Sequence, residues 1–149
     1  MNGFSQYDEK TAINGTFGQV WLEGDLVREA TGLKADVQLN YMDVPMCGTL
    51  AKHQKVSGID CTGVINMTKT NSRMAVKISE MIRSGKTPKF TIISKLADPD
   101  ANGAERVVLK NCQFSSLTLA DWNQGQLGTV SQPFTFTDWE YIDLIEPQV

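Results

Sequence analysis

At 149 residues the chain is long enough for one ordinary domain with a hydrophobic core, and too short to favour two. Hydrophobic residues make up 41% and charged residues 21%, a balance typical of a globular protein and not of a disordered chain. The formal charge of −3 and the lack of any run of Lys or Arg disfavour tight binding to nucleic acid.

The cysteines and the N-terminus bear on the cellular compartment. Cys47, Cys61 and Cys112 are an odd number without CxxC spacing, so we expect free thiols in a reducing interior and neither a disulfide framework nor a zinc site. The start of the chain has no basic segment followed by an apolar run, and no stretch approaches the roughly 18 apolar residues of a spanning helix. We therefore expect assembly in a cytoplasm and no stable membrane insertion.

The first elements in chain order are an arm and a hairpin. Residues 1–15 are polar and turn-rich, and we expect them to form an N-terminal arm before a single β domain over residues 16–149. From Phe17, the sequence FGQVWLEGDLV predicts two strands joined by a turn at Glu23-Gly24-Asp25, because apolar residues flank a turn that contains glycine. We expect the returning strand to run on into the next segment.

That segment has the clearest periodicity in the chain. Apolar and polar residues alternate from residue 33 to 40, which predicts a strand with one buried and one wet face. The apolar series is Leu33, Ala35, Val37 and Leu39, and the polar series is Lys34, Asp36, Gln38 and Asn40.

The pattern then dissolves into a segment that we predict to be a long loop, about residues 40–55. The loop is unusually apolar, and large apolar patches on a globular chain usually await a partner. Its candidate contact residues are Tyr41, Met42, Val44, Met46, Leu50 and His53.

A strand and the one convincing helix follow. Residues 56–68 are rich in β-branched residues, and Gly58 and Gly63 indicate a bulge or a close neighbouring backbone. Residues 72–84 predict a helix with an N-cap at Asn71 or Ser72 and Gly85 at C′. Its apolar stripe, which we expect to face the core, consists of Met74, Ile78, Met81 and Ile82, whereas Val76 falls off the stripe and is expected to be exposed.

The last third of the chain predicts further strands. KFTIISKL and ERVVLKNCQF are joined by the turn ADPDANGA, SLTLADW predicts another strand, and NQGQLGT predicts a turn. In the final strand, around QPFTFTDWEYIDLIE, Phe134 and Phe136 have one phase and Trp139 and Tyr141 the other. Either a bulge intervenes or both faces are covered, as happens where a sheet continues into another subunit.

About seven short strands and one helix indicate a mainly β fold. We expect an antiparallel β-sandwich or barrel with one flanking α-helix at about residues 72–84 and the long loop at about 40–55. No alternation of helices and strands supports a parallel sheet.

The sequence contains no complete motif for a catalytic, metal or cofactor site. His53 is the only histidine, and no local signature pairs it with Cys47 or Cys61, so a surface or interface role is favoured over a hydrolase. The turn from Asp98 to Gly103 matches the first half of an EF-hand loop, but Leu109 stands where the bidentate Glu belongs. No GxxxxGK[ST] or GxGxxG motif is present. We expect no cofactor and no enzymatic activity; a small-ligand binding β-barrel is the alternative function.

Four blocks of the sequence carry a resemblance to a known family. They are GTFGQVWLEGDLVREATGLKADVQLN, KVSGIDCTGVINMTKTNSRMAVKI, KFTIISKLADPDANGAERVVLKNCQF and QPFTFTDWEYID, which together cover most of residues 15–143. In their combination, order and spacing they resemble the PBSX-type phage tail-tube proteins of contractile-tailed phages, defective prophages and related phage-tail-like bacteriocins.

The resemblance implies a structural subunit and no catalytic residues. It implies six copies in a ring, rings stacked into a hollow tube, and the long loop reaching toward the adjacent ring. The expected partners are further copies of the chain, the tail sheath, and the tape-measure, baseplate and tube-terminator proteins, with transient passage of DNA in a phage. The particle would be a virion tail or an extracellular phage-tail-like particle assembled in the host cytoplasm. Candidate contacts between subunits along the last strand are Trp139, Tyr141 and Ile142, and Lys34, Asp36 and Gln38 are candidates to face the lumen.

Overall fold

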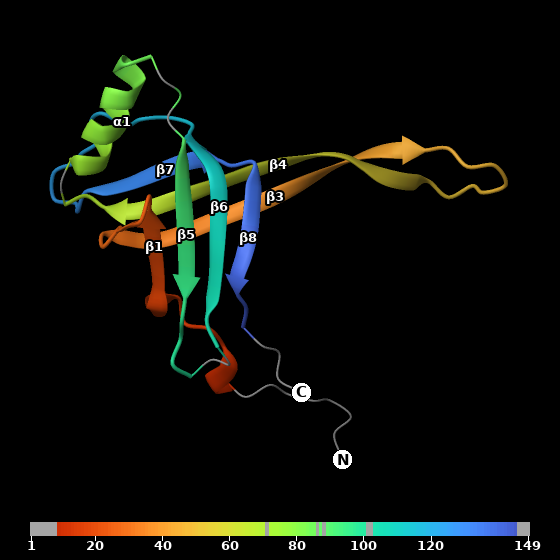
Figure 1. The fold of residues 1–149 in the computed structure, drawn as a ribbon, viewed down its shortest axis with the longest axis horizontal. Helices are drawn as coiled ribbons and strands as arrows, with labels where there is room; N and C mark the ends of the chain where they lie inside the picture. Colours follow the sequence, from red (N-terminus) through yellow and green to blue (C-terminus); the bar gives the residue numbers. More distant parts are fainter. Residues whose placement is uncertain (1–8, 71, 86, 88, 101–102, 146–149) are drawn as a thin grey trace.

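The computed structural model describes residues 9–145 except 71, 86, 88 and 101–102. Within these residues it has eight strands, one α-helix and two short 3-10 helices (Figure 1). In chain order the elements are η1 (Glu9–Thr11), η2 (Gly15–Phe17), β1 (Gly18–Leu22), β2 (Asp25–Leu26), β3 (Ala30–Val44), β4 (His53–Thr68), α1 (Arg73–Arg83), β5 (Phe90–Leu96), β6 (Glu105–Phe114), β7 (Thr129–Thr135) and β8 (Asp138–Asp143).

The strands form one antiparallel sheet that folds over at β6. The order is β2-β1-β5-β6-β7-β4-β3, and β8 pairs with β6 as well. Residues 106–110 of β6 pair with β8, whereas Gln113 and Phe114 at its end pair with β7. Figure 1 shows the β7-β4-β3 layer crossing behind the β1-β5-β6-β8 layer at a steep angle. The predicted mainly β, antiparallel fold with one flanking helix is confirmed.

The hydrophobic core lies between these two layers. Ile92 and Cys112 come from the first layer and Ile65 and Phe134 from the second, and all four are almost completely buried. A side chain buried to this degree contributes roughly 1.5–3 kcal/mol through removal of apolar surface from water. The phenyl rings of Phe134 and Phe136 pack at 6.1 Å between centroids, so the core extends to the place where the chain leaves β7.

The predicted first hairpin is present, but its second strand is short. Glu23 and Gly24 have φ angles of 52° and 84°, the left-handed values that a tight two-residue hairpin turn requires. The strand does not run on as expected: β2 ends at Leu26, and β3 begins at Ala30 in the other layer. The chain thus changes layer within a few residues.

The segment expected to be a long loop is the outer part of a β-ribbon. Strands β3 and β4 pair from Ala30 with Met67 out to Val44 with His53, and only residues 45–52 connect them. The ribbon projects far beyond the body of the protein (Figure 1). Sequence periodicity does not reveal the outer part of the ribbon because Met42 and Val44 place apolar residues on the face opposite Tyr41, so the alternation is lost there. Cross-strand pairing holds the ribbon together.

The helix agrees with its predicted limits. Ser72 occupies the N-cap position without a side-chain cap hydrogen bond, and Gly85 follows the helix with a φ of 74°. Ile78 is buried and Met81 packs against the core, but Ile82 is 53% exposed and was wrongly placed on the buried stripe. Met81 and Ile82 lie about 100° apart around the axis, so a narrow contact that includes Met81 leaves Ile82 in solvent. Val76 is exposed as expected, and the side chain of Met74 lies outside the described residues.

Two other expectations about the last third are wrong. The predicted final strand is two strands, because the chain leaves β7, which pairs with β4, and enters β8, which pairs with β6. This change of layer accounts for the change of phase between Phe136 and Trp139. The segment SLTLADW contains no strand: its described residues run along the surface, and Leu119 and Trp122 are each 77% exposed.

The described part of the N-terminal arm is fastened to the turn between β5 and β6. Asp98 is buried, and its carboxylate accepts a hydrogen bond from the backbone N–H of Asn14 at 2.8 Å and another from Asp100 at 3.0 Å. Residues 1–8 of the predicted arm lie outside the described residues. One carboxylate of the turn that resembles a calcium loop therefore binds the backbone of the arm.

Candidate assembly surfaces

The ribbon has one apolar face that continues the surface of the body. Side chains alternate along each strand, and the register places Val37 opposite Cys61, Leu39 opposite Ile59, and Tyr41 opposite Val56. Cys61 is buried in the body, whereas the residues farther out are 44–53% exposed. We call these exposed residues the ribbon stripe: Leu39, Tyr41, Val56 and Ile59.

The other face of the ribbon is more polar, although Met42 and Val44 lie on it. Their cross-strand partners are Lys55 and His53. Along this face toward the body, the side-chain amide of Asn40 donates a hydrogen bond to Asp60 at 3.0 Å. The ribbon is therefore amphipathic, with an apolar stripe on one side and mixed residues on the other.

The structure gathers the predicted loop residues at the outer ribbon and its tip. All six are exposed, and Leu50 in the tip is entirely open to solvent. Their exposed fractions are 53% for Tyr41, 54% for Met42, 37% for Val44, 55% for Met46 and 105% for Leu50. Such a series of large apolar side chains in water indicates a surface that another molecule covers.

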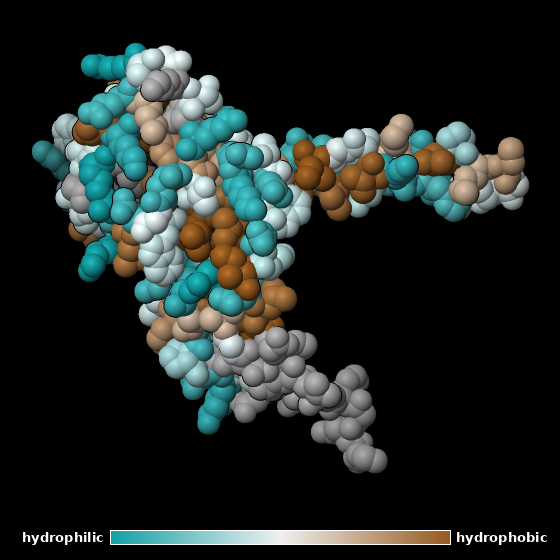
Figure 2. Space-filling view, viewed as in Figure 1, coloured by the Kyte–Doolittle hydropathy of each residue, from teal (hydrophilic) through white to brown (hydrophobic). Residues whose placement is uncertain are grey.

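The predicted contacts on the last strand lie at the edge of the other layer. Trp139 and Tyr141 of β8 face a groove that also contains Leu33 and Val37 at the root of the ribbon. Trp139 packs edge-on against the buried ring of Phe136 at 6.4 Å between centroids. Two of the three predicted residues thus line one apolar corner together with the root of the ribbon. Figure 2 shows the open angle between the ribbon and the body.

Ile142 lies at a register shift of β8, between Tyr141 and Asp143, and does not line that corner. It is half exposed and lies beside Leu144. Elsewhere on β8 the ammonium of Lys110 donates a hydrogen bond to the Glu140 carboxylate at 3.0 Å, and this bond, with the negative charge of Glu140, raises the pKa of Lys110. The face of β8 that carries Glu140 is therefore polar.

The free edge of β8 has a specific consequence. Among the described strands, β8 pairs only with β6, so its outer edge presents backbone N–H and C=O groups with no strand beside them. Unpaired edges of this kind readily accept a strand from another chain.

Sequence reasoning missed one exposed apolar surface. The connection between β6 and β7 carries three large apolar residues that are 77–86% exposed. We call them the loop patch: Leu119, Trp122 and Leu127. The available signal was the nearby Gly125 and Gly128, which are unusual in a strand and favour an irregular surface loop.

The geometry gives no support to chemistry at the histidine. His53 is at the outer end of β4 and Cys61 is eight residues along the same strand, roughly 26 Å away at 3.3 Å per residue. No hydrogen bond links His53 to Cys47 in the part of the chain that the structure describes. Within the same residues, no three His, Cys, Asp or Glu side chains cluster to hold a metal ion, and no helix is long and apolar enough to cross a membrane.

A family model described as phage tail tube protein matches residues 5–143 of the chain. The chain belongs to this family. It is therefore a tail-tube subunit.

Curated relatives agree with this family. The chain is 26% identical over 133 residues to the phage-like element PBSX protein XkdM of Bacillus subtilis strain 168. The match covers 88% of this chain and 90% of the relative. The uncharacterized protein YqbM of the same strain matches with the same identity and coverage.

Solved structures share the fold of this tail-tube protein. A chain of the PVC sheath–tube complex, an extracellular contractile injection system in its extended state, matches with a TM-score of 0.70 at 9% identity, over 91% of this chain and 95% of that one. A chain of the anti-feeding prophage tube-terminating cap matches with a TM-score of 0.65 at 14% identity, over 95% of both chains. A chain from the tail of an empty gene transfer agent particle, refined with C6 symmetry, matches with a TM-score of 0.53 at 10% identity, over 89% of this chain and all of that one.

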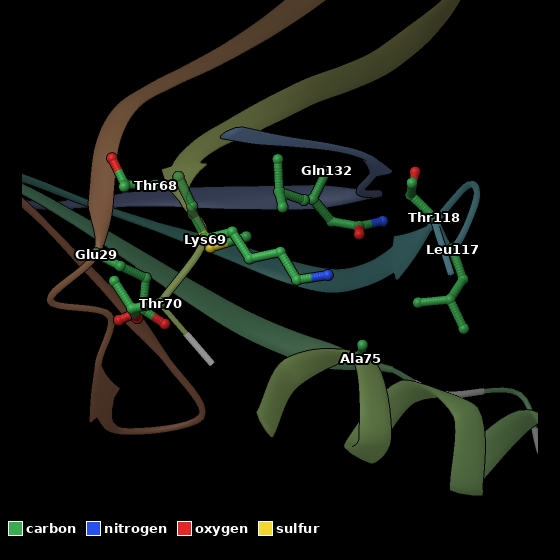
Figure 3. A pocket seen from close by; sticks show the side chains of 10 residues that line it. Glu29, Thr68, Lys69, Thr70, Ala75, Leu117, Thr118 and Gln132 are labelled. Carbon is green, nitrogen blue, oxygen red and sulfur yellow. The ribbon is translucent and has the colours of Figure 1, made fainter. Parts of the chain in front are cut away.

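A hollow between α1 and the ends of β4 and β7 is a further concave feature of the tail-tube protein. Figure 3 shows Glu29, Lys69 and Gln132 around it, with Ala75 of the helix on one side. Its volume is about 50 Å³, far below the roughly 300–1,000 Å³ of sites that enclose small ligands. This hollow therefore offers no room for the ligand of a binding barrel.

Proposed function

We propose that the chain forms rings of six copies that stack into a hollow inner tube, and that it performs no catalysis of its own. The observation that carries this proposal is the apolar corner between the root of the ribbon and β8, next to an unpaired strand edge and to the exposed ribbon stripe. Ring closure would cover that edge, which on a free subunit invites uncontrolled pairing. A small-ligand protein has no need of such a surface.

The number six and the partners are supported by the structural relatives. One relative comes from a tail refined with C6 symmetry and another from a baseplate that was 6-fold symmetrised. Others come from a sheath–tube complex, a sheath and tube terminator, and a tube cap. By analogy, we assign this subunit sheath, baseplate and terminator partners, a tape-measure protein that sets length, and passage of DNA if the particle is a phage.

The same reasoning suggests a place for each part of the chain. Residues 16–149 would form the tube domain, with residues 1–15 as an arm that binds neighbours. The ribbon would reach the adjacent ring through Tyr41, Met42, Val44, Met46, Leu50 and His53, and the β8 edge would meet the next subunit through Trp139, Tyr141 and Ile142. Lys34, Asp36 and Gln38 are candidates for the lumen. The particle would assemble in the host cytoplasm and act as a virion tail or an extracellular particle.

Electron microscopy of the purified protein over a concentration series tests the proposal. Hollow tubes or six-membered rings are the expected result, and the native particle that contains the chain should include such a tube. Monodisperse monomers at every concentration, with no particle containing the chain, would instead favour the small-ligand function.

A further inference from the structure

The loop patch and the outer ribbon lie at opposite ends of β4. Thr68 at the inner end of β4 pairs with Thr129, and the backbone N–H of Lys69 donates a hydrogen bond to Gly128 at 2.8 Å, so the loop patch adjoins this end. His53 at the other end of β4 adjoins the ribbon tip. The 16 residues of β4 span roughly 50 Å at 3.3 Å per residue.

Because of this separation, the loop patch of one copy cannot touch its own ribbon. Figure 1 shows the ribbon extending away from the body on the side opposite to the connection between β6 and β7. Two different apolar surfaces at opposite ends of one chain are what a head-to-tail contact between identical copies requires, and such contacts close into rings or continue as filaments.

We infer that the outer ribbon of one copy docks on the loop patch of a neighbouring copy. This inference rests on the proposed assembly and adds the acceptor surface for the ribbon. Trp122 would be its centre, since large aromatic side chains dominate the binding energy of protein interfaces.

The charges of the two segments agree with this pairing. The ribbon tip, residues 45–52, contains Lys52 and no acidic residue, whereas residues 115–128 contain Asp121 and no Lys or Arg. Opposite charges at the rim of an apolar contact favour the correct partner and orientation.

Cross-linking of assembled protein tests the contact directly. Cys47 is an exposed thiol in the ribbon tip, and Cys61 and Cys112 are buried. The variant Gln124→Cys places a second thiol beside the loop patch. After treatment of tubes with a short bismaleimide, we expect a ladder of covalent oligomers on a denaturing gel, formed through Cys47.

Two matched variants control this experiment. Asp100→Cys places the thiol in the turn between β5 and β6, and Cys47→Ser combined with Gln124→Cys removes the ribbon thiol; neither should give the ladder. If tubes form but Gln124→Cys gives no more product than Asp100→Cys, the inference is overturned while the proposed function stands. If the wild-type chain forms no assembly at all, both are overturned.

A second variant measures the energetic role of the loop patch. In Leu119→Ser with Trp122→Ser, we expect the concentration needed for assembly to rise at least tenfold, because each interface anchor of this kind is worth more than about 1.4 kcal/mol. The monomer should unfold as the wild type does, since both side chains are exposed, and Val76→Ser on the exposed helix face should assemble normally. Normal tubes from the double variant that no longer bind sheath protein would assign the patch to the sheath and overturn the inference.

Discussion

The ring of Phe134 occupies the space that a side chain at Gly63 would need. The two residues are cross-strand partners in β4 and β7. A Cβ at Gly63 would meet the Phe134 ring on one side and lie 2.6 Å from the backbone oxygen of Lys34 on the other. Glycine at this position therefore allows the largest fully buried side chain to pack flat against the strand.

Gly63→Ala should destabilise the folded chain. The added methyl group has to displace either the buried ring or a backbone carbonyl, and overpacking of this kind costs about 1–3 kcal/mol. Chemical denaturation of the unassembled subunit measures the change. Gly58→Ala is the matched control, because a Cβ there meets nothing within 4 Å; an equal loss from both variants would contradict the packing argument.

The sequence anticipated features whose cause is local or repeats along a strand. The alternation of Leu33 to Leu39, the turn at Glu23 and Gly24, and the helix ending at Gly85 depend on side-chain periodicity or on backbone conformations that glycine favours. A glycine within a predicted strand, as at Gly63, also indicated a bulge or a close neighbouring backbone. These features need no knowledge of distant contacts.

Features that depend on distant contacts were not predicted. The outer ribbon lacks a buried face, so Tyr41 and Met42 resemble loop residues although both are paired with β4. The break between β7 and β8 follows from a change of partner strand, and the loop patch around Trp122 has no periodicity of its own. Pairing partners are a property of the whole fold, and a single sequence does not state them.

Ile78→Ala should weaken the attachment of α1. Ile78 is 3% exposed and packs in the core cluster, so removal of its side chain should cost about 2–4 kcal/mol. Ile82→Ala makes the same chemical change at a residue that is 53% exposed, and it should cost less than about 0.5 kcal/mol. Thermal or denaturant unfolding checks the pair, and similar losses would mean that the helix buries Ile82 as well.

Asp98→Ala should release the described part of the N-terminal arm. Without the carboxylate, the partly buried backbone N–H groups of Asn14 and Asp100 lose a charged acceptor, at a cost of about 1–3 kcal/mol. Hydrogen exchange of these two amides should accelerate at least tenfold. Asp100→Ala is the control, because its backbone N–H keeps the same acceptor; slow exchange at Asn14 in Asp98→Ala would show that other contacts hold the arm.

Cys112 should make the folded state less stable at alkaline pH. Burial raises the pKa of its thiol from 9.0 to about 11. Between these two pH values the thiol is protonated in the folded state and ionised in the unfolded state. The stabilisation is complete below pH 9 and declines as the pH rises toward 11. Between about pH 8 and pH 10.5 the wild type should lose on the order of 1 kcal/mol more than Cys112→Ala. Equal losses in denaturation experiments would contradict this assignment.

Shortening β3 and β4 by whole cross-strand pairs should abolish assembly and leave folding intact. Removing residues 41–50 alone would leave the outer part of β4 without its partner strand, so a sound variant removes residues 41–57 and joins Asn40 to Gly58 with an Asn-Gly turn. All of the removed residues are exposed, so the trimmed chain should keep its cooperative unfolding transition.

The trimmed chain should no longer form tubes, because the outer ribbon stripe and the tip are gone. A matched variant replaces only residues 45–52 with Asn-Gly between Val44 and His53, which are the outermost cross-strand pair. It keeps Tyr41 and Val56, so its assembly should be weakened less. Electron microscopy and sedimentation compare the two variants with the wild type. Normal tubes from the chain that lacks residues 41–57 would mean that the ribbon has no part in assembly, and the subunit contacts would then have to lie along β8 and the loop patch.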